Sequence, residues 1–533
     1  MSFAKQMPMP RGRAENLAVI FGDQLDHDAG LLKRLDPDND VILMAEVDGE
    51  QEEGPSHKVR TAVFFAAMRH YALWLSERGF RVRYVRVDSR GNTQSLEGEI
   101  DRAIEAHKPQ RLLVTHPGDW RVMETLDAID AVDVEVLDDE HFYTTPSEFA
   151  EWADGRKSLV MEFFYREQRK KLGILMDGKQ PTGGEWNYDK DNRESFKSEP
   201  GVRAPYSPEP DEITAEVISL VNSRYADAPG RLDESNWIWP VRRDKALRAL
   251  RDFVEHRLAD FGPFEDAMWT GEHTLFHSLL SVPLNLKLLN PRECVDAALE
   301  AFKAEKAPLN SVEGFVRQLI GWREYIRGVY WFEGADYRDR NFLGQDGDLP
   351  EFYWNGETDM KCMSECLAPV LDHAWSHHIP RLMVLSNFAM IAGVAPRAIG
   401  DWFYGMYADA VDWATTPNTI GMGSYADGIP GKREPVVGTK PYAASGKYIS
   451  RMSNYCKHCS YDVKKRTGKD ACPFNTFYWD FLIRHENRFS KNNRMAMIMK
   501  NVKRLKKDDR VEITTSAKSL REKFGVAPAK VSA

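Results

Sequence analysis

The first 140 residues alternate between short apolar runs and longer amphipathic stretches. Five apolar runs rich in β-branched residues predict strands, at Leu17–Phe21, Val41–Val47, Val82–Val87, Leu112–Thr115 and Val132–Leu137. Helical patterns lie between several of them, at Ser56–Arg78, Gln94–Ala106 and Val122–Ile129. Near-continuous apolar strands that alternate with helices are typical of a parallel sheet covered on both faces. The pattern therefore predicts an N-terminal α/β domain with a Rossmann-like parallel sheet.

The pattern changes beyond this region. Residues 180–212 are rich in Pro, Gly and charged side chains, which is typical of a long interdomain connection. From about Glu216 to Phe489 the pattern is mostly helical, with a Gly- and Pro-rich loop at 420–446. We therefore divide the chain into an N-terminal extension (1–16), an α/β domain (17–145), a linker (146–215), an all-helical domain (216–489) and a basic tail (490–533). The tail is expected to begin as a helix and to fray at Pro528.

Composition excludes several classes of protein. Of the 533 residues, 42% are hydrophobic and 29% are charged, which is globular composition and excludes disorder for the bulk of the chain. No apolar run approaches the roughly 18 residues of a membrane helix. Residues 1–16 lack the apolar core of a signal peptide. We expect a cytoplasmic protein with no membrane partner.

Charge is distributed unevenly. The net charge is −9, but residues 1–150 carry 17 basic and 28 acidic side chains, whereas residues 484–533 carry 14 basic and 5 acidic ones. An acidic balance argues against nucleic acid as a partner. The basic tail nevertheless leaves room for one basic face, where contacts with phosphates would dominate affinity.

Five of the six cysteines fall between Cys362 and Cys472, and six are too few for a disulfide scaffold. Cys456 and Cys459 form a C-x-x-C motif, Cys472 follows thirteen residues later, and Cys362 and Cys366 are four residues apart. Such a set can hold zinc or an iron–sulfur cluster, and spacing alone does not separate the two. The alternative is a group of buried, inert thiols.

The helical half contains three segments rich in aromatic and basic residues. The segments are Gln318-Leu319-Ile320-Gly321-Trp322-Arg323-Glu324-Tyr325, His377-His378 with Arg381 and Asn387, and Trp402 to Trp413. Taken singly, an aromatic stripe at helical spacing is more often core than a redox path, and a pair of histidines is more often structural than catalytic. None of these segments alone indicates a function.

Together these motifs carry a resemblance. Residues 318–325 resemble the W-R-E-[FY] helix of the cryptochrome/photolyase family, and His277-Ser278-Leu279-Leu280-Ser281 resembles its phosphate-binding segment. Hydroxyls and free N–H groups at a helix start suit a pyrophosphate. The cysteine set, Gly22-Asp23-Gln24-Leu25, residues 375–383 and residues 438–449 further resemble the iron–sulfur bacterial cryptochromes and photolyases, or prokaryotic (6-4) photolyases. The resemblance extends from about Leu17 to Phe489.

The resemblance implies three cofactors: FAD, a 6,7-dimethyl-8-ribityllumazine antenna and a [4Fe–4S] cluster. The implied cluster ligands are Cys362, Cys456, Cys459 and Cys472, with Cys366 as an extra thiol. Asp23, Gln24 and Glu46 match antenna-contacting positions at the carboxyl ends of parallel strands, where open α/β sheets bind ligands. The alternative interpretation of Glu46 is a surface carboxylate.

The residues implied in FAD binding are His277, Ser278, Leu279, Leu280, Ser281, Gln318, Trp322, Arg323, Arg381, Asn387, Asp409, Thr415 and Asn418. Arg381 and Asp409 are expected to pair at the edge of the flavin ring, where a cation favours the reduced, anionic cofactor. Thr415 aligns with the position facing flavin N5, where members of the family can carry an acidic residue.

The implied activity is that of a (6-4) DNA photolyase, a lyase that repairs (6-4) pyrimidine photoproducts in UV-damaged DNA by light-driven electron transfer from reduced FAD. The lesion is flipped out of the duplex into a pocket. His378 matches a lesion-facing histidine placed to exchange a proton, and Tyr442 and Tyr448 match tyrosines of the same pocket. Asp189 and Asp266 match acidic positions for a divalent cation such as Mg²⁺.

Trp402 and Trp354 match relays that return electrons to the flavin, although Phe403 stands where the family usually has Tyr. Two other functions stay open. One is a blue-light photoreceptor (cryptochrome) with the same cofactors and little repair. The other is a light-independent nucleic-acid-binding protein with a structural four-cysteine zinc site. In each case we expect a monomer.

Overall fold

A five-stranded parallel sheet forms the N-terminal part of the chain. The computed structural model describes residues 3–48, 54–156 and 158–526. The strands are β1 (Asn16–Val19), β2 (Val41–Ala45), β3 (Arg81–Val85), β4 (Arg111–Thr115) and β5 (Asp133–Leu137), in the spatial order β3-β2-β1-β4-β5. β1 pairs with β2 at Leu17–Val41 and with β4 at Leu17–Leu112. The five predicted strands all form, although β1, β2 and β3 end two residues earlier than expected.

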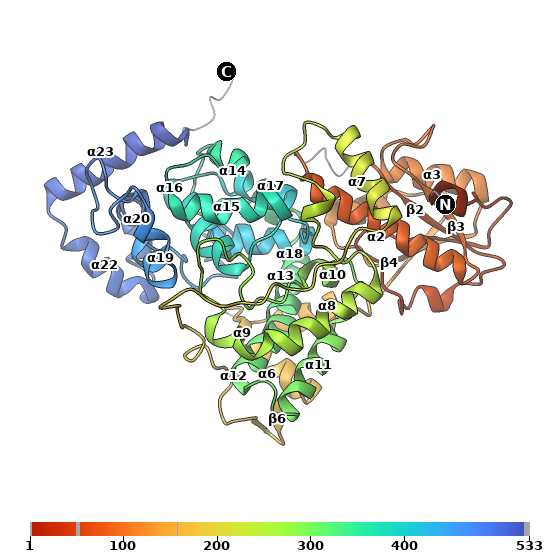
Figure 1. Ribbon diagram of the computed structural model, residues 1–533, viewed down its shortest axis with the longest axis horizontal. Helices are drawn as coiled ribbons and strands as arrows, with labels where there is room; N and C mark the ends of the chain where they lie inside the picture. The colour runs from red at the N-terminus through yellow and green to blue at the C-terminus, as the bar shows by residue number, and fades with distance from the viewer. Residues whose placement is uncertain (1–2, 49–53, 157, 527–533) are drawn as a thin grey trace.

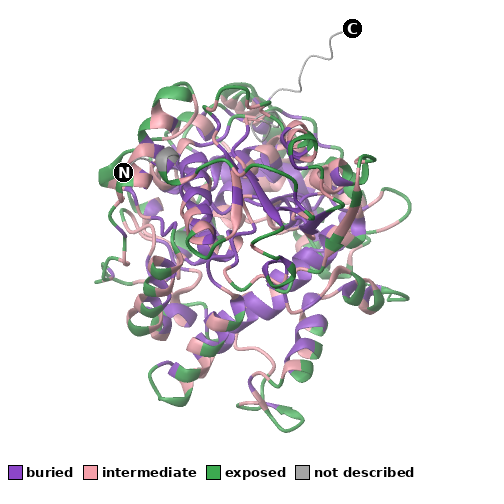
Figure 2. Cartoon of the chain, turned by 90° about the vertical axis from the view of Figure 1, so that its right-hand side faces the viewer, coloured by how far each residue is buried: buried purple, intermediate pink, exposed green. Residues whose placement is uncertain are grey.

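Helices cover both faces of this sheet, because successive side chains of a strand point to opposite faces. Ala18 and Ile20 pack with α2 (Lys58–Glu77), whereas Leu17 and Val19 pack with α3 (Leu96–His107) and α4 (Trp120–Asp127). Figure 2 shows the strands buried between these layers. The short α1 (Phe3–Gln6) closes one side, with the Phe3 ring 4.9 Å from that of Tyr84.

The connection to the helical half contributes its own elements. α5 (Pro146–Ala153) contacts α13 (Glu324–Glu333), and α6 (Met161–Leu172) contacts η4 (Arg317–Arg323), so both already pack with the helical half. A small hairpin, β6 (Met176–Asp177) and β7 (Gln180–Pro181), follows, and the chain then runs without regular structure until α7 (Glu212–Arg224) packs on α2.

The remainder is helical, as Figure 1 shows on the left and at the bottom. Its α-helices are α8 (Arg243–His256), α9 (Leu258–Phe264), α10 (Ser281–Asn285), α11 (Pro291–Lys303), α12 (Leu309–Val316), α13, α14 (Phe352–Asn355), α15 (Lys361–His373), α16 (Asn387–Ala392), α17 (Pro396–Met406), α18 (Asp412–Thr416), α19 (Gly446–Met452), α20 (Pro473–Arg484), α21 (Glu486–Phe489), α22 (Ala496–Lys503) and α23 (Lys507–Phe524). Short 3₁₀ turns are η1 (Leu32–Arg34), η3 (Glu234–Asn236), η5 (Ala335–Asp339), η8 (Tyr455–His458) and η9 (Asn493–Met495).

The predicted fold class, a parallel α/β domain followed by a large all-α region, is confirmed. Two hydrophobic cores stabilise the helical region, one shared with one face of the sheet and one formed mainly by α14 to α17 and α19 to α23. Within the described residues, no helix combines the length and apolar character needed to cross a membrane. The predicted fraying at Pro528 lies outside the described residues.

Candidate functional site

Three π-helical segments mark the centre of the helical half. They are η4 (Arg317–Arg323), η6 (Pro380–Ser386) and η7 (Pro417–Gly423), and the described residues contain no other. A π-helical turn is rare and is frequently found at functional sites. Each segment carries residues predicted to bind FAD: Gln318, Trp322 and Arg323 in η4, Arg381 in η6, and Asn418 in η7. η6 and η7 pack tightly, since a Cβ added at Gly423 would lie 2.9 Å from Cβ of Ser386.

The expected pair between Arg381 and Asp409 forms. Nη1 and Nη2 of Arg381 donate to the two carboxylate oxygens of Asp409 at 3.0 and 2.8 Å, a two-pronged geometry that fixes both planes. Nε of Arg381 donates to the carbonyl of Ser376 at 2.7 Å, and the guanidinium lies 4.1 Å from the centre of the Tyr407 ring. The Arg381 side chain keeps 27% exposure, so one face of the pair remains accessible.

Further residues hold this pair in place. Nδ2 of Asn285 donates to the backbone carbonyl of Asp409 at 2.7 Å, and the hydroxyls of Ser376 and Tyr407 are 2.9 Å apart. Sequence reasoning missed Asn285, Ser376 and Tyr407. No pattern could have identified them, because their roles depend on contacts between segments far apart in the chain.

Other predicted FAD residues differ in what their side chains do. Asn418 is exposed, while Gln318, Trp322 and Thr415 are half-buried. Ser278 accepts a hydrogen bond from the Leu280 N–H at 3.3 Å, and Ser281 begins α10, next to the left-handed Leu279. These residues can all present polar groups or a ring face to a cofactor.

Asn387 and Arg323 bind distant parts of the chain, whereas the amides of Gln318 and Asn418 each donate to a carbonyl one turn back, at 3.1 and 2.7 Å. Asn387 binds the backbone of Ala444 in both directions, at 2.9 and 3.0 Å, and so holds the 438–446 loop. Arg323 is buried against Phe142, donates to His141 Nδ1 at 2.9 Å and faces the α/β domain. Their roles in FAD binding stay predictions.

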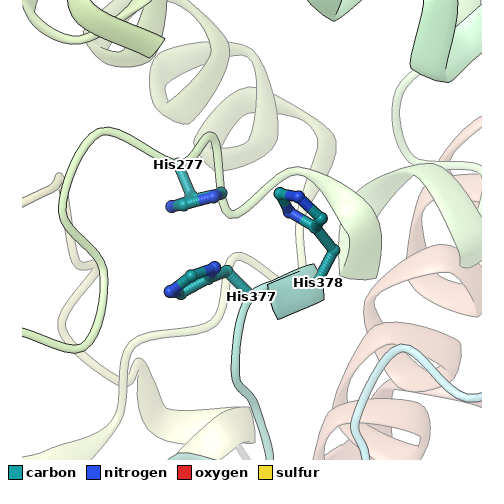
Figure 3. A group of neighbouring side chains, drawn as sticks. All are labelled: His277, His377 and His378. Atoms are coloured by element: carbon teal, nitrogen blue, oxygen red, sulfur yellow. The ribbon is translucent and has the colours of Figure 1, made fainter. Parts of the chain in front are cut away.

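Three histidines lie close together at the 277–281 segment, which resembles a phosphate-binding segment (Figure 3). The rings of His277 and His377 stack with centres 4.0 Å apart, and one nitrogen from each of His277, His377 and His378 lies within 4.8 Å of the others. Burial lowers the pKa of His277 to about 3 and that of His377 well below its usual value, so both are neutral. His378 differs, with 51% of its side chain exposed.

Asp266 links two residues predicted to face the lesion. Its Oδ1 lies 3.4 Å from Nε2 of His378, and its Oδ2 accepts from the Tyr448 hydroxyl at 3.5 Å. Burial and Asp266 raise the pKa of Tyr448, so the phenol keeps its proton. His378 and Tyr448 therefore lie at one place, 70 residues apart in sequence, around one carboxylate.

Two more predicted residues lie close by. Burial raises the pKa of Tyr442, and the nearby Asp189 carboxylate adds to this effect. Burial likewise raises the pKa of Glu265 to about 7, with Asp266 and Asp189 adding to the rise. Asp189 is already paired with Arg317, and Asp266 with His378. Carboxylates thus gather here, while the predicted divalent cation stays a prediction.

Four cysteines from distant segments line one small cavity. They are Cys362 in α15, Cys456 and Cys459 around η8, and Cys472 before α20. Burial, with the other cysteines adding to it, raises the pKa of Cys362 well above its usual value. Because burial disfavours free thiolates, a cation is needed to hold four of them together. The donor set fits a four-thiolate metal or cluster, whereas Cys366 is outside the lining of the cavity.

A second cavity, of about 120 Å³, lies at the carboxyl ends of β1 and β2. Asp23 and Glu46 line it, together with Tyr404 and Asp412 from the helical half. The Glu46 carboxylate is 1% exposed and already accepts from Arg69 at 2.7 and 3.0 Å, from the Tyr84 hydroxyl at 2.7 Å and from the Val87 N–H at 3.0 Å. It is not a surface carboxylate.

Gln24 has a different place from Asp23 and Glu46. Its amide donates to the carbonyls of Thr115 and His116 at 3.1 and 3.3 Å, and so ties the end of β1 to the end of β4. The cavity is lined by aromatic rings such as Phe64 and Tyr404 and by charged side chains such as Asp23 and Arg60. That the antenna occupies it stays a prediction.

Trp402 lies in a continuous set of aromatic contacts. It is fully buried, its Nε1 donates to the Tyr353 carbonyl at 3.1 Å, and its ring lies 5.1 Å from Tyr353 and 5.8 Å from Tyr407. Tyr407 lies beneath Arg381, and half-buried Trp354 adjoins Tyr353 in the chain. Trp402 thus contacts Tyr353, the chain neighbour of Trp354, and sequence reasoning missed both Tyr353 and Tyr407.

Comparison with known proteins agrees with this fold. Residues 18–237 match the family described as deoxyribodipyrimidine photo-lyase-related protein. The fold is similar to a bacterial class III photolyase from Agrobacterium tumefaciens (TM-score 0.54, 15% identity, 83% of this chain and 86% of that one) and to a cryptochrome from Synechocystis sp. (TM-score 0.55, 15% identity, 84% and 89%).

A curated relative covers nearly the whole chain. Over 513 residues the chain is 44% identical to a (6-4) photolyase from Agrobacterium fabrum (strain C58), a match that spans 95% of this chain and 99% of the relative. On this identity, and on its α/β and helical architecture, the chain belongs to the photolyase/cryptochrome family, in the branch of the prokaryotic (6-4) photolyases.

Proposed function

We propose that this chain repairs (6-4) pyrimidine photoproducts in UV-damaged DNA, driven by light. The observation that carries the proposal is the 44% identity over 95% of the chain to a protein named (6-4) photolyase. The grouping of His378, just before η6, with Asp266 and Tyr448 supports it.

The family implies a flavin, and the site has groups that would hold one. Arg381, fixed by Asp409 and Ser376, would supply a cation to the edge of the flavin ring. Exposed Asn418 and half-buried Gln318 offer amide oxygens, since their NH2 groups already donate to backbone carbonyls, and the 277–281 segment offers hydroxyls near a helix start. When bound, reduced and excited by blue light, FAD supplies one electron to the lesion.

The lesion also needs a proton, which a side chain of the protein must supply. His378 is exposed toward solvent, and its Nε2 lies 3.4 Å from the Asp266 carboxylate, which can orient an imidazole that exchanges a proton with the lesion. His277 and His377, which are buried and neutral, lie next to His378 on its protein side. We infer that His378 gives a proton to the lesion, and that Tyr448 and Tyr442 orient the flipped base.

The finer parts of the proposal concern the other cofactors. We infer that Cys362, Cys456, Cys459 and Cys472 hold a [4Fe–4S] cluster, that 6,7-dimethyl-8-ribityllumazine occupies the cavity beside Asp23 and Glu46, and that Trp402 and Trp354 relay electrons. Asp189 and Asp266 are inferred to face any divalent cation beside the lesion. The residues that line the two cavities support the cluster and antenna assignments.

One experiment tests the function. Chemically reduced holoprotein is illuminated with oligonucleotides that carry one (6-4) lesion, one cyclobutane dimer or no lesion. We expect light-dependent restoration of the (6-4) oligonucleotide only. Binding of damaged DNA without repair would overturn the proposal in favour of a photoreceptor, and zinc in place of iron by elemental analysis, without flavin absorbance, would favour the light-independent alternative.

A further inference from the structure

Residues 487–507, here called the basic segment, contain no Asp or Glu. They hold eight cations: Arg488, Lys491, Arg494, Lys500, Lys503, Arg504, Lys506 and Lys507. All except Arg488 are exposed, and within the described part of the chain none of these seven forms an ion pair. The neighbouring Glu486 is already bound by Arg510 at 2.7 Å. The segment therefore presents uncompensated positive charge to solvent.

The fold holds this charge on a fixed surface. Met495, Met499 and Val502 are buried in the second core, and α22 contacts α20 and α21. Lys500, Lys503 and Arg504 have i, i+3, i+4 spacing and so share the opposite, exposed face of the helix. Apolar packing on one side thus orients the cations outward on the other.

The basic segment begins beside the loop predicted to line the lesion pocket. Nδ2 of Asn492 donates to the Thr439 carbonyl at 3.1 Å and to the Tyr425 hydroxyl at 3.4 Å. Arg494 lies near enough to Tyr442 to oppose the burial-driven rise of its pKa. The basic segment therefore begins beside the loop predicted to line the pocket, and α22 follows it in the chain.

A helix-capping role does not account for all of this charge. Cations near a helix C-terminus offset its dipole, but only Lys500 and Lys503 occupy the last turn of α22. The surrounding region adds to the surplus, because residues 438–507 contain 17 Lys and Arg and 4 Asp and Glu. A polyanion is the partner that matches this surface, and the proposed function supplies one next to the pocket.

We propose that the basic segment binds the phosphates of the DNA duplex on one side of the lesion. The proposal rests on the proposed function only in taking DNA as the substrate. The eight residues of α22 span about 12 Å, and phosphates recur every 3.4 Å or so along one strand, so roughly three or four phosphates come within reach. Such contacts fix position and affinity and carry no sequence preference.

The test compares two charge-matched triple variants of the full-length holoprotein. K500Q/K503Q/R504Q removes the three positive charges on the exposed face of α22. K179Q/K303Q/K306Q removes three exposed lysines near β6–β7 and α11, which Figure 1 shows at the lower tip, away from α22. Binding of a 30-base-pair duplex, with and without one (6-4) lesion, is measured in the dark over a range of salt concentrations.

We expect K500Q/K503Q/R504Q to weaken binding about 10- to 100-fold at moderate salt and to lower the slope of log K against log salt by about 2 to 3, since each phosphate contact contributes about 0.9. The lesion-containing and undamaged duplexes should lose affinity by the same factor. The lower-tip variant should match the unaltered protein in both affinity and slope.

Shortening the duplex locates the surface. Removing the flank on one side of the lesion should weaken binding by the unaltered protein but not by K500Q/K503Q/R504Q, while removing the other flank should weaken both. Unchanged salt slope in K500Q/K503Q/R504Q, or equal loss in the lower-tip variant, would overturn the proposal. Because these measurements are made in the dark, failure of the unaltered protein to repair would overturn the proposed function and leave this inference standing.

Discussion

The antenna cavity and the lesion side of this molecule treat their charged residues in opposite ways. In the cavity, the Glu46 carboxylate is 1% exposed and every lone pair direction is taken up by Arg69, Tyr84 and Val87. On the lesion side, His378 is 51% exposed and has one long contact, 3.4 Å from Asp266. A fully bonded group organises structure, whereas an under-bonded group remains available to a substrate.

The same contrast holds for whole regions. Residues 1–150 carry 28 acidic and 17 basic side chains, whereas residues 438–507 carry 4 and 17. Since like charge repels a polyanion, DNA would approach the second region and avoid the first. The antenna cavity therefore lies in the acidic part of the chain, while the basic region includes the loop predicted to line the lesion pocket.

Replacing His378 tests the proposal that this exposed side chain is available to the lesion. His378→Asn keeps a polar side chain but removes the proton, and loss of a general acid typically costs about 10²–10⁴-fold. We expect repair per absorbed photon to fall in that range while FAD content, iron content and binding of damaged DNA persist. His377→Asn, at a buried and neutral position, is the matched control for repair chemistry and should lose less. Near-normal repair by His378→Asn would mean that another group, Tyr442, Tyr448 or water, donates the proton.

Replacing Glu46 tests the fully bonded group. Glu46→Ala leaves Arg69, whose side chain is fully buried, without its main partner, and breaking such a pair costs about 3–5 kcal/mol. We expect faster hydrogen exchange throughout β1–β3 and weaker lumazine retention, with FAD still bound. Glu216→Ala, which removes a 29% exposed second partner of Arg69, should cost less.

The double variant E46L/R69M separates structure from ligand contact. Replacing both partners of a buried pair by apolar residues is often neutral. If E46L/R69M restores slow exchange and lumazine content, the carboxylate serves the fold. If exchange is restored and lumazine is still lost, Glu46 contacts the antenna directly.

Sequence predicted more of the fold than of the site. Apolar runs specified all five strands, because buried parallel strands need little beyond continuous hydrophobicity. The π-helical turns escaped prediction, because the residues of η4, η6 and η7 continue a helical pattern. The Glu46–Arg69 pair escaped as well, since its partners lie 23 residues apart and meet only through the packing of α2 on the sheet. The resemblance, rather than the pattern, directed attention to His378.

Cysteine substitutions test whether the four cluster ligands implied by the resemblance are the correct ones. Cys362→Ser and Cys459→Ser each remove one of the four thiols that line the cavity, so iron content and the yield of folded protein should fall strongly, because cluster binding is coupled to folding. Cys366→Ser alters a buried thiol outside the lining, one turn along the same helix, and should keep its iron. Loss of iron from Cys366→Ser with retention in Cys362→Ser would reverse the assignment.

The smallest effect is expected at Phe403, the residue that departs from the family. Its ring is 4% exposed, lies 5.0 Å from Trp402 and stacks 5.2 Å from Tyr407. Phe403→Tyr leaves the contacts from Tyr407 through Trp402 to Tyr353 intact, so light-driven reduction of oxidised flavin should change by about twofold or less. The added hydroxyl, if buried without a partner, should cost about 1–3 kcal/mol of stability. Trp402→Phe, which breaks the set at its centre, should abolish that reduction while pre-reduced protein still repairs. A rate more than about tenfold higher in Phe403→Tyr would mean that a tyrosine branch limits electron return.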